Sequence, residues 1–235
     1  MIQIIPSERR HFNDLGWLKT YWLFSFSDYF DKENTHHGTL RVFNDDIVLP
    51  QTGFGTHPHE EMEIVSIVLS GEMQHHDTMG NKTIIRKNDV QRMTAGTGLQ
   101  HSEWNHGDEP VKFFQIWILP DKKGLQPSYD QKSISPTLWK NNLYLLASEN
   151  GREDVVSLNT DANLYRAELH GNNTISFQAG QDRNLFVYVV EGSVKVNGHD
   201  VNKRDQARIN NEKSLQISTD ESADFILIDI PITNH

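Results

Sequence analysis

Three histidines and one glutamate occur as two closely spaced pairs, His57 with His59 and His101 with Glu103. Side chains alternate between the two faces of a β-strand, so residues two apart project from the same face. If neighbouring strands bring the pairs together, three imidazoles and one carboxylate converge on one point. Such a ligand set, without thiolate, suits a divalent transition metal with coordination positions left open. The spacing therefore predicts a metal centre at these four residues.

Turn-forming residues stand before each pair. Gly53 and Gly55 precede the first pair, and a small-residue turn over residues 95–98 precedes the second. Such turns are consistent with delivery of the side chains to the mouth of a β-barrel. Pro58 cannot donate a ladder hydrogen bond, which indicates an edge strand or a strand entry. Asn105 follows Glu103 at an even step, and we expect it to hydrogen-bond a ligand.

Other titratable residues compete for a place in this centre. Glu63 has the same strand parity as His57 and His59, but we prefer Glu103 for the carboxylate because its partner in the pair is a histidine. The remaining candidates are weaker and stay open as residues that line a pocket or lie on the surface. They are His36 and His37 near an expected turn, and His75 and His76 beside Asp77.

Composition excludes several classes of function. The chain has 235 residues, a formal net charge of −10 and no cysteine. The missing cysteines rule out disulfides, thiolate metal sites and cysteine nucleophiles. The negative charge, with no basic run, disfavours direct contact with nucleic acid or an anionic membrane. No segment has the apolar length of a membrane span or of a signal peptide, so we expect a cytoplasmic protein.

The apolar segments predict an all-β fold. They are short, rich in β-branched and aromatic residues, and separated by Gly, Asn, Asp and Pro, whereas no long segment shows a helical period. These segments cover residues 39–43, 62–69, 83–85, 113–119, 186–190, 193–196 and 225–230.

Two parts of the chain repeat one pattern. A strand, a glycine turn and a second strand follow each other around Gly71 and again around Gly192, and an apolar strand ending in proline follows each block, at Pro120 and Pro231. We infer a duplicated β-barrel with a connection near residues 125–142. The predicted domains are 1–130, which carries the metal ligands, and 131–235, which has no His-x-His sequence and lacks them.

The spacing of these residues resembles the cupin superfamily. Its first motif corresponds to His57, His59, Glu63 and Gly71, and its second to Gly98, His101 and Asn105. The proline usual in the second motif is absent, because the segment reads Ala95-Gly96-Thr97.

A narrower resemblance is to the pirin family, and specifically to bacterial pirin-like quercetinases, over residues 11–120. It rests on Gly16-Trp17-Leu18, Phe24-Ser25-Phe26, Leu40-Arg41-Val42, Asn44-Asp45-Asp46, the segment 53–59, Met62-Glu63-Ile64, the segment 94–98, His101-Ser102-Glu103 and Gln115-Ile116-Trp117. The residues Thr35-His36-His37-Gly38 depart from the apolar and glycine residues usual there. The resemblance implies a bicupin, two jelly-roll barrels in tandem, with one metal site in the first, held by His57, His59, His101 and Glu103.

The resemblance also implies an activity. Bacterial relatives are quercetin 2,3-dioxygenases, which open the central ring of a flavonol with dioxygen and release carbon monoxide. Ferrous iron is then the expected metal, although other divalent metals can replace it, and Glu103 is the candidate base for the substrate hydroxyl. Eukaryotic pirins instead imply an iron-dependent regulatory protein that binds a protein partner without turnover. A cupin isomerase or a zinc hydrolase is a third possibility, because histidine and carboxylate suit zinc as well.

Overall fold

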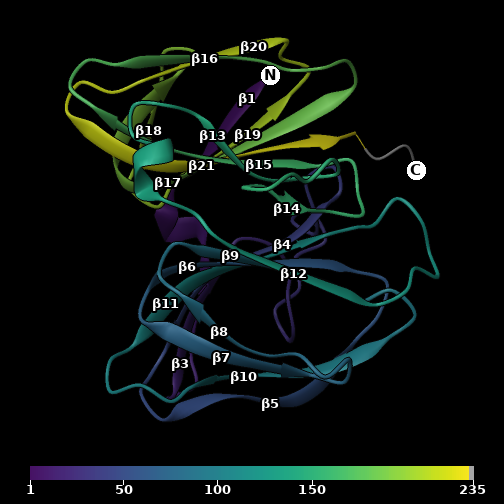
Figure 1. The fold of residues 1–235 in the computed structure, drawn as a ribbon. Helices are drawn as coiled ribbons and strands as arrows, with labels where there is room; N and C mark the ends of the chain where they lie inside the picture. The colour runs from purple at the N-terminus through teal and green to yellow at the C-terminus, as the bar shows by residue number, and fades with distance from the viewer. Residues whose placement is uncertain (233–235) are drawn as a thin grey trace.

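The computed structural model describes residues 1–232 and shows two β-barrels stacked on each other (Figure 1). These residues form 21 strands and two short 3₁₀ helices, η1 (Ser7–Arg9) and η2 (Pro136–Leu138). The predicted all-β fold with two cupin-type barrels is confirmed. In the described residues, no helix has the length and apolar character needed to cross a membrane.

The N-terminal barrel is made of two sheets, which lie in the lower half of Figure 1. Its seven-stranded sheet has the order β12 (Ser128–Ser133), β9 (Asp89–Thr94), β6 (Glu63–Ser70), β11 (Val111–Ile118), β4 (Leu40–Val48), β3 (Leu18–Trp22) and β2 (His11–Asp14). Its four-stranded sheet has the order β5 (Thr52–His59), β10 (Leu99–Asn105), β7 (Glu72–Asp77) and β8 (Lys82–Arg86).

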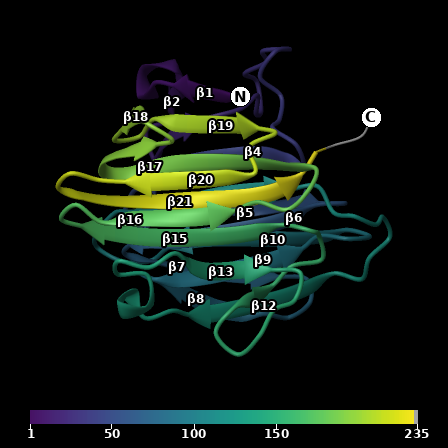
Figure 2. The same cartoon turned by 90° about the horizontal axis from the view of Figure 1, so that it is seen from above.

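The C-terminal barrel is built from one ten-stranded sheet, whose strands lie nearest the viewer in Figure 2. The main path has the order β1 (Ile2–Ile5), β19 (Gln206–Asn210), β17 (Arg183–Val196), β21 (Ser222–Pro231), β15 (Asn163–His170), β13 (Tyr144–Ser148) and β14 (Val156–Ser157). Three further strands pair off this path, namely β16 (Thr174–Gln178), β18 (His199–Asn202) and β20 (Ser214–Ser218).

Strand pairing differs in two places from a simple division at residue 130. Strand β1 pairs antiparallel with β19, so the first residues of the chain belong to the C-terminal barrel. Strand β12 pairs with β9 along its whole length and extends the N-terminal barrel to Ser133. The chain therefore begins in one barrel, forms the other, and returns to the first.

The two barrels share a topology, as the repeated sequence pattern predicts. In the N-terminal barrel β6 lies between β9 and β11, and in the C-terminal barrel β17 lies between β19 and β21. Gly71, between β6 and β7, and Gly192, within β17, occupy matching positions with φ of +76° and +74°. A Cβ on Gly71 would lie 3.0 Å from the Cα of Val111, and one on Gly192 would lie 3.1 Å from the Cα of Ala223. Only glycine fits both the positive φ and the close approach.

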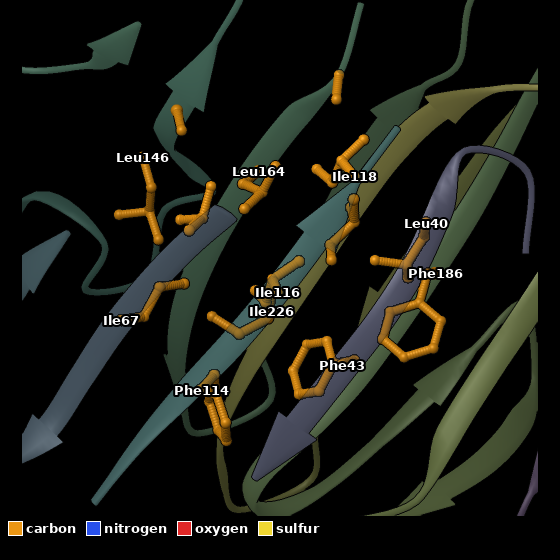
Figure 3. Close-up of a cluster of buried hydrophobic side chains, with 14 of the residues drawn as sticks. Leu40, Phe43, Ile67, Phe114, Ile116, Ile118, Leu146, Leu164, Phe186 and Ile226 are labelled. Carbon is orange, nitrogen blue, oxygen red and sulfur yellow. The ribbon is translucent and has the colours of Figure 1, made fainter. Parts of the chain in front are cut away.

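The largest hydrophobic cluster lies between the barrels rather than inside either one (Figure 3). Alternation along the strands explains it. In β11, Phe114 and Ile116 face the second barrel while Gln115 faces the interior of the first; in β17, Phe186 packs in the same cluster while Val187 faces the interior of its own barrel. At these residues both strands are buried on both faces, so the second barrel packs closely behind the interior of the first.

Candidate metal centre

Strands β5 and β10 bring the two predicted pairs together. They pair antiparallel in the four-stranded sheet, with His101 opposite His57 and Leu99 opposite His59. The register shifts between His101 and Glu103, a β-bulge that places Glu103 opposite Phe54. Strand β5 lies at the edge of its sheet, which is the position that Pro58 predicted.

The three histidine rings lie against one another. The ligand nitrogens of His57, His59 and His101 all lie within 4.8 Å of one another. Nε2 of His57 is 3.0 Å from Nε2 of His101. Nδ1 of His57 lies 2.8 Å from the carbonyl oxygen of Gly55, to which it must donate its proton, because a carbonyl can only accept. When the His57 ring is neutral, its Nε2 therefore carries a lone pair, and this atom faces His101.

Burial keeps the rings of His59 and His101 neutral. Burial lowers the pKa of His59 to about 4, with a smaller contribution from His57. Burial also lowers the pKa of His101, and the neighbouring histidines lower it further. Neutral imidazoles are the form that coordinates a metal.

Glu103 supplies a buried carboxylate on the same strand. Its exposed fraction is 1%, and burial raises its pKa to about 7, although the hydrogen bond from Gln115 opposes the shift. Nε2 of Gln115 donates to Oε2 of Glu103 at 3.0 Å, and Nε1 of Trp117 donates to Oε1 of Gln115 at 3.2 Å. The other carboxylate oxygen, Oε1, is buried without a hydrogen-bond partner among the described residues.

His75 forms a second cluster with His101 and Glu103, and it is completely buried. Their ligand atoms again lie within 4.8 Å of one another. His101 therefore belongs to both clusters, whereas Glu103 is grouped with His75 rather than with His57 and His59. The sequence offered one signal for His75: it alternates with buried Met73 and with Asp77, so all three share a face of β7.

This arrangement fits a divalent transition metal. Nε2 atoms that coordinate one metal at about 2.1 Å and at right angles are about 3.0 Å apart, which is the separation of His57 and His101. A buried carboxylate oxygen without a partner is costly unless a cation or a donor lies near it. The donor set, three imidazoles and one carboxylate, contains only ligands that such metals accept.

Two residues of the cupin-like pattern lie elsewhere. Glu63 is fully buried, but its Oε2 accepts a hydrogen bond from the backbone of Asn159 in the second barrel, so it belongs to the contact between barrels. Asn105 does not hold a ligand as expected: its side chain donates to the carbonyls of Val48 and Glu109 and fixes the following turn. Gln115, on β11, is instead the residue whose side chain hydrogen-bonds Glu103.

The candidate histidines before β4 also lie away from the centre. His37 is buried, and its Nε2 is 3.1 Å from the carbonyl oxygen of Leu185 in the second barrel. His36 contacts Thr35 through its Nδ1. His37 therefore does not line a pocket beside the histidine cluster, because its side chain contacts the second barrel.

Open cavities adjoin the histidine cluster. One of about 780 Å³ is lined by Pro58, His59, Thr78 and Leu99, among others. A second, of about 400 Å³, is lined by Phe26, Met62 and Trp117. His59 lines the first cavity and Trp117 the second, and their rings pack edge to face with centroids 4.9 Å apart. The first volume is that of a small-molecule site.

Comparison with known proteins gives the family. The model described as Pirin matches residues 6–118, and the model described as quercetinase C-terminal cupin domain matches residues 145–230. Quercetin 2,3-dioxygenase of Escherichia coli (strain K12) is 36% identical over 226 residues, which are 96% of each chain. The chain belongs to the pirin family. A pirin-like protein of Caulobacter vibrioides is 38% identical over 97% of this chain and 99% of its own length.

Crystal structures of another pirin agree closely with this one. YhhW from Escherichia coli, 34% identical, superposes with a TM-score of 0.95 over 100% of both chains. Its complex with nickel(II) gives a TM-score of 0.94 over 99% of this chain and 100% of YhhW. The family predicted from the motifs is confirmed.

Proposed function

We propose that this pirin-family chain is a metal-dependent dioxygenase that cleaves the central ring of flavonols such as quercetin and releases carbon monoxide. The observation that carries the proposal is the cluster of His57, His59 and His101 beside an open cavity. The 36% identity with a quercetin 2,3-dioxygenase, over almost the full length of both chains, supports the reaction class.

The proposed ligands are His57, His59, His101 and Glu103, and the proposed native metal is Fe(II). His57 and His101 offer Nε2, and Glu103 offers the oxygen that has no other partner. The nickel complex of YhhW supports a divalent metal in this fold but leaves the native ion as part of the proposal.

The chain's own residues then bind and deprotonate the substrate. A divalent metal with open positions acts as a Lewis acid towards an oxygen anion such as that of a flavonol. Glu103 is the proposed base that takes the proton of the substrate's 3-hydroxyl, and Gln115 holds the other carboxylate oxygen in place. Trp117 fixes Gln115 and packs against His59, so one side chain supports both parts of the centre.

The test is turnover with defined metal content. Protein is loaded anaerobically with ferrous iron, mixed with quercetin and exposed to air, while loss of flavonol absorbance and release of carbon monoxide are recorded. We expect both signals from the wild type, and their loss in His57→Ala and Glu103→Ala. His199→Ala, at an exposed position in the second barrel, is the matched control and should keep full activity.

The possible results of this assay distinguish a dioxygenase from a binding protein. Full turnover by Glu103→Ala would remove Glu103 as base and as required ligand. Tight iron binding by the wild type with no consumption of any flavonol would contradict the proposed enzyme and favour a binding protein.

A further inference from the structure

Asp77 and His75 form a buried pair directly behind His101. Nε2 of His75 is 3.0 Å from Oδ2 of Asp77, and neither side chain is exposed. The other side of the same imidazole faces the centre, with Nδ1 of His75 3.5 Å from Nδ1 of His101, a long N–H···N contact. Asp77, His75, His101 and His57 thus form one continuous row of polar groups.

The surroundings hold Asp77 as an acceptor. Its Oδ1 accepts from the backbone N–H groups of Met79 and Asn81 at 2.9 and 3.0 Å. Its Oδ2 accepts from Nδ2 of Asn81 at 2.8 Å. Burial acts to raise the pKa of Asp77, but the hydrogen bonds from Asn81 and His75 outweigh it and lower this pKa. An ionised carboxylate only accepts, so Nε2 of His75 must carry the proton between them.

The proton on Nε2 of His75 determines which nitrogen of His101 carries a proton. A neutral His75 with its proton on Nε2 has a lone pair on Nδ1, which can accept only if Nδ1 of His101 carries a proton. Nε2 of His101 then has a lone pair and faces Nε2 of His57, which also has one when the His57 ring is neutral. Two lone pairs 3.0 Å apart repel each other unless a cation lies between them.

We propose that Asp77 and His75 are positioning residues that fix the tautomer of His101 so that its Nε2 is presented to the metal. This inference rests on the proposed function only in taking His57 and His101 as ligands. The ring of Tyr129 packs against His75 at 5.0 Å and holds its plane. Ligating histidines commonly donate their second N–H to such a partner, which orients the ring and makes it more basic.

Direct ligation of a metal by His75 is the alternative, because His75, His101 and Glu103 also form a cluster. In that case Nδ1 of His75 would bind the metal and His101 would lose its partner. The two arrangements place the proton of His101 differently, so an experiment can separate them.

Asp77→Asn removes one charge and reverses the direction of the hydrogen bonds from residue 77 through His75 to His101. The backbone donors of Met79 and Asn81 hold the amide oxygen at the position of Oδ1, so the amide nitrogen faces His75, and the side-chain amide of Asn81 turns over so that its oxygen accepts. Nε2 of His75 then accepts, its Nδ1 carries the proton, and Nε2 of His101 becomes protonated. We expect the affinity for Zn(II) to fall about 10- to 100-fold.

Two readouts test this with Zn(II), a diamagnetic ion that accepts these ligands. Competition with a chromophoric chelator measures affinity, and long-range ¹H–¹⁵N correlation spectra locate the proton on each ring. In the zinc-loaded wild type we expect the proton of His75 on Nε2 and that of His101 on Nδ1. His76→Asn, in the next position of β7 with its side chain on the other face, is the control and should bind as the wild type does.

His75→Phe provides a second variant if Asp77→Asn does not fold, since it keeps the ring contact with Tyr129 and removes the acceptor. It should also weaken zinc binding at least tenfold. An affinity within twofold of the wild type in either folded variant overturns the inference, as does a metal-bound Nδ1 of His75 in the wild type. Neither readout needs turnover, so a chain that shows the predicted protons but consumes no flavonol contradicts the proposed activity alone.

Discussion

The interiors of the two barrels are filled in opposite ways. The C-terminal barrel holds a continuous apolar cluster that includes Leu185, Val187 and Leu227. The N-terminal barrel has instead a polar layer: Asn44 and Ser66 are the cross-strand partners of Gln115 and lie on the same face of the sheet. Six of the ten buried side-chain atoms without a hydrogen-bond partner in residues 1–232 belong to it, on Thr20, Asn44, Asp46, Ser66, Gln91 and Glu103.

The two barrels therefore differ in what their interiors contribute to the free energy of folding. Unpaired buried polar atoms cost free energy, and burial raises the pKa of Asp46 in this layer to about 8. The apolar cluster inside the C-terminal barrel contributes none of these atoms within residues 1–232, and this barrel packs against its partner through the large shared cluster. A duplicated fold can thus keep one copy for stability and use the other for a site that is locally unfavourable.

His101→Leu should have the largest effect, because His101 belongs to both clusters of candidate ligands. We expect affinity for a divalent metal to fall by about 100-fold or more, since two sets of three ligands each lose a member. Chelator competition measures it, with His199→Ala as the control. Retention of wild-type affinity by His101→Leu would place the metal outside the polar barrel.

The contact between the barrels should weaken in acid through His37. Burial lowers its folded-state pKa to about 4 from a usual 6.5. The unfolded chain therefore takes up this proton first, and stability present above pH 6.5 is lost as the pH falls towards 4, by about 2 to 3 kcal/mol. Urea unfolding of the wild type and His37→Leu across this range measures the difference. A gap between the two proteins that does not change with pH would contradict it.

A matched pair of substitutions tests the comparison of interiors directly. Val187→Thr places a hydroxyl in the apolar barrel and should cost about 1 to 3 kcal/mol, because the group finds no partner. Ser66→Ala removes a hydroxyl that already lacks one and should be neutral or slightly stabilising. Chemical denaturation measures the change in the free energy of unfolding for both variants. Equal costs at the two sites would mean that the interiors do not differ in this way.

Glu103→Gln should produce a small change in the stability of the metal-free protein, and in the stabilising direction. The amide keeps an acceptor for Gln115 but cannot ionise, so the cost of burying a charge disappears. A gain of about 1 kcal/mol corresponds to a rise in melting temperature of about 2 to 4 °C. The same variant should lose the stabilisation that added metal gives the wild type. A lower melting temperature without metal would show that the carboxylate is stabilising.

The sequence was most informative about residues whose positions follow from the alternation of side chains along a strand. Alternation in strands predicted that His57 and His59 share a face, as do His101 and Glu103, and the observed register joins them. The repeat around Gly71 and Gly192 predicted a topology that the second barrel reproduces, because the same positive φ and close approach recur.

Contacts between strands far apart in the sequence could not be predicted. Gln115 and His75 reach the centre from strands whose register no local pattern specifies, and Glu63 shares the parity of the ligands yet faces the other barrel. The pairing of β1 with β19 joins residues about 200 apart, which no local pattern predicts. Burial and register, rather than residue type, decide these roles.

Anomalous diffraction at the metal edge, from crystals of the chain loaded with one divalent transition metal, tests the central claim most directly. The account predicts one strong peak per chain, in the N-terminal barrel, within coordination distance of Nε2 of His57 and of His101. A strong peak in the C-terminal barrel, or no peak near these histidines, would contradict it.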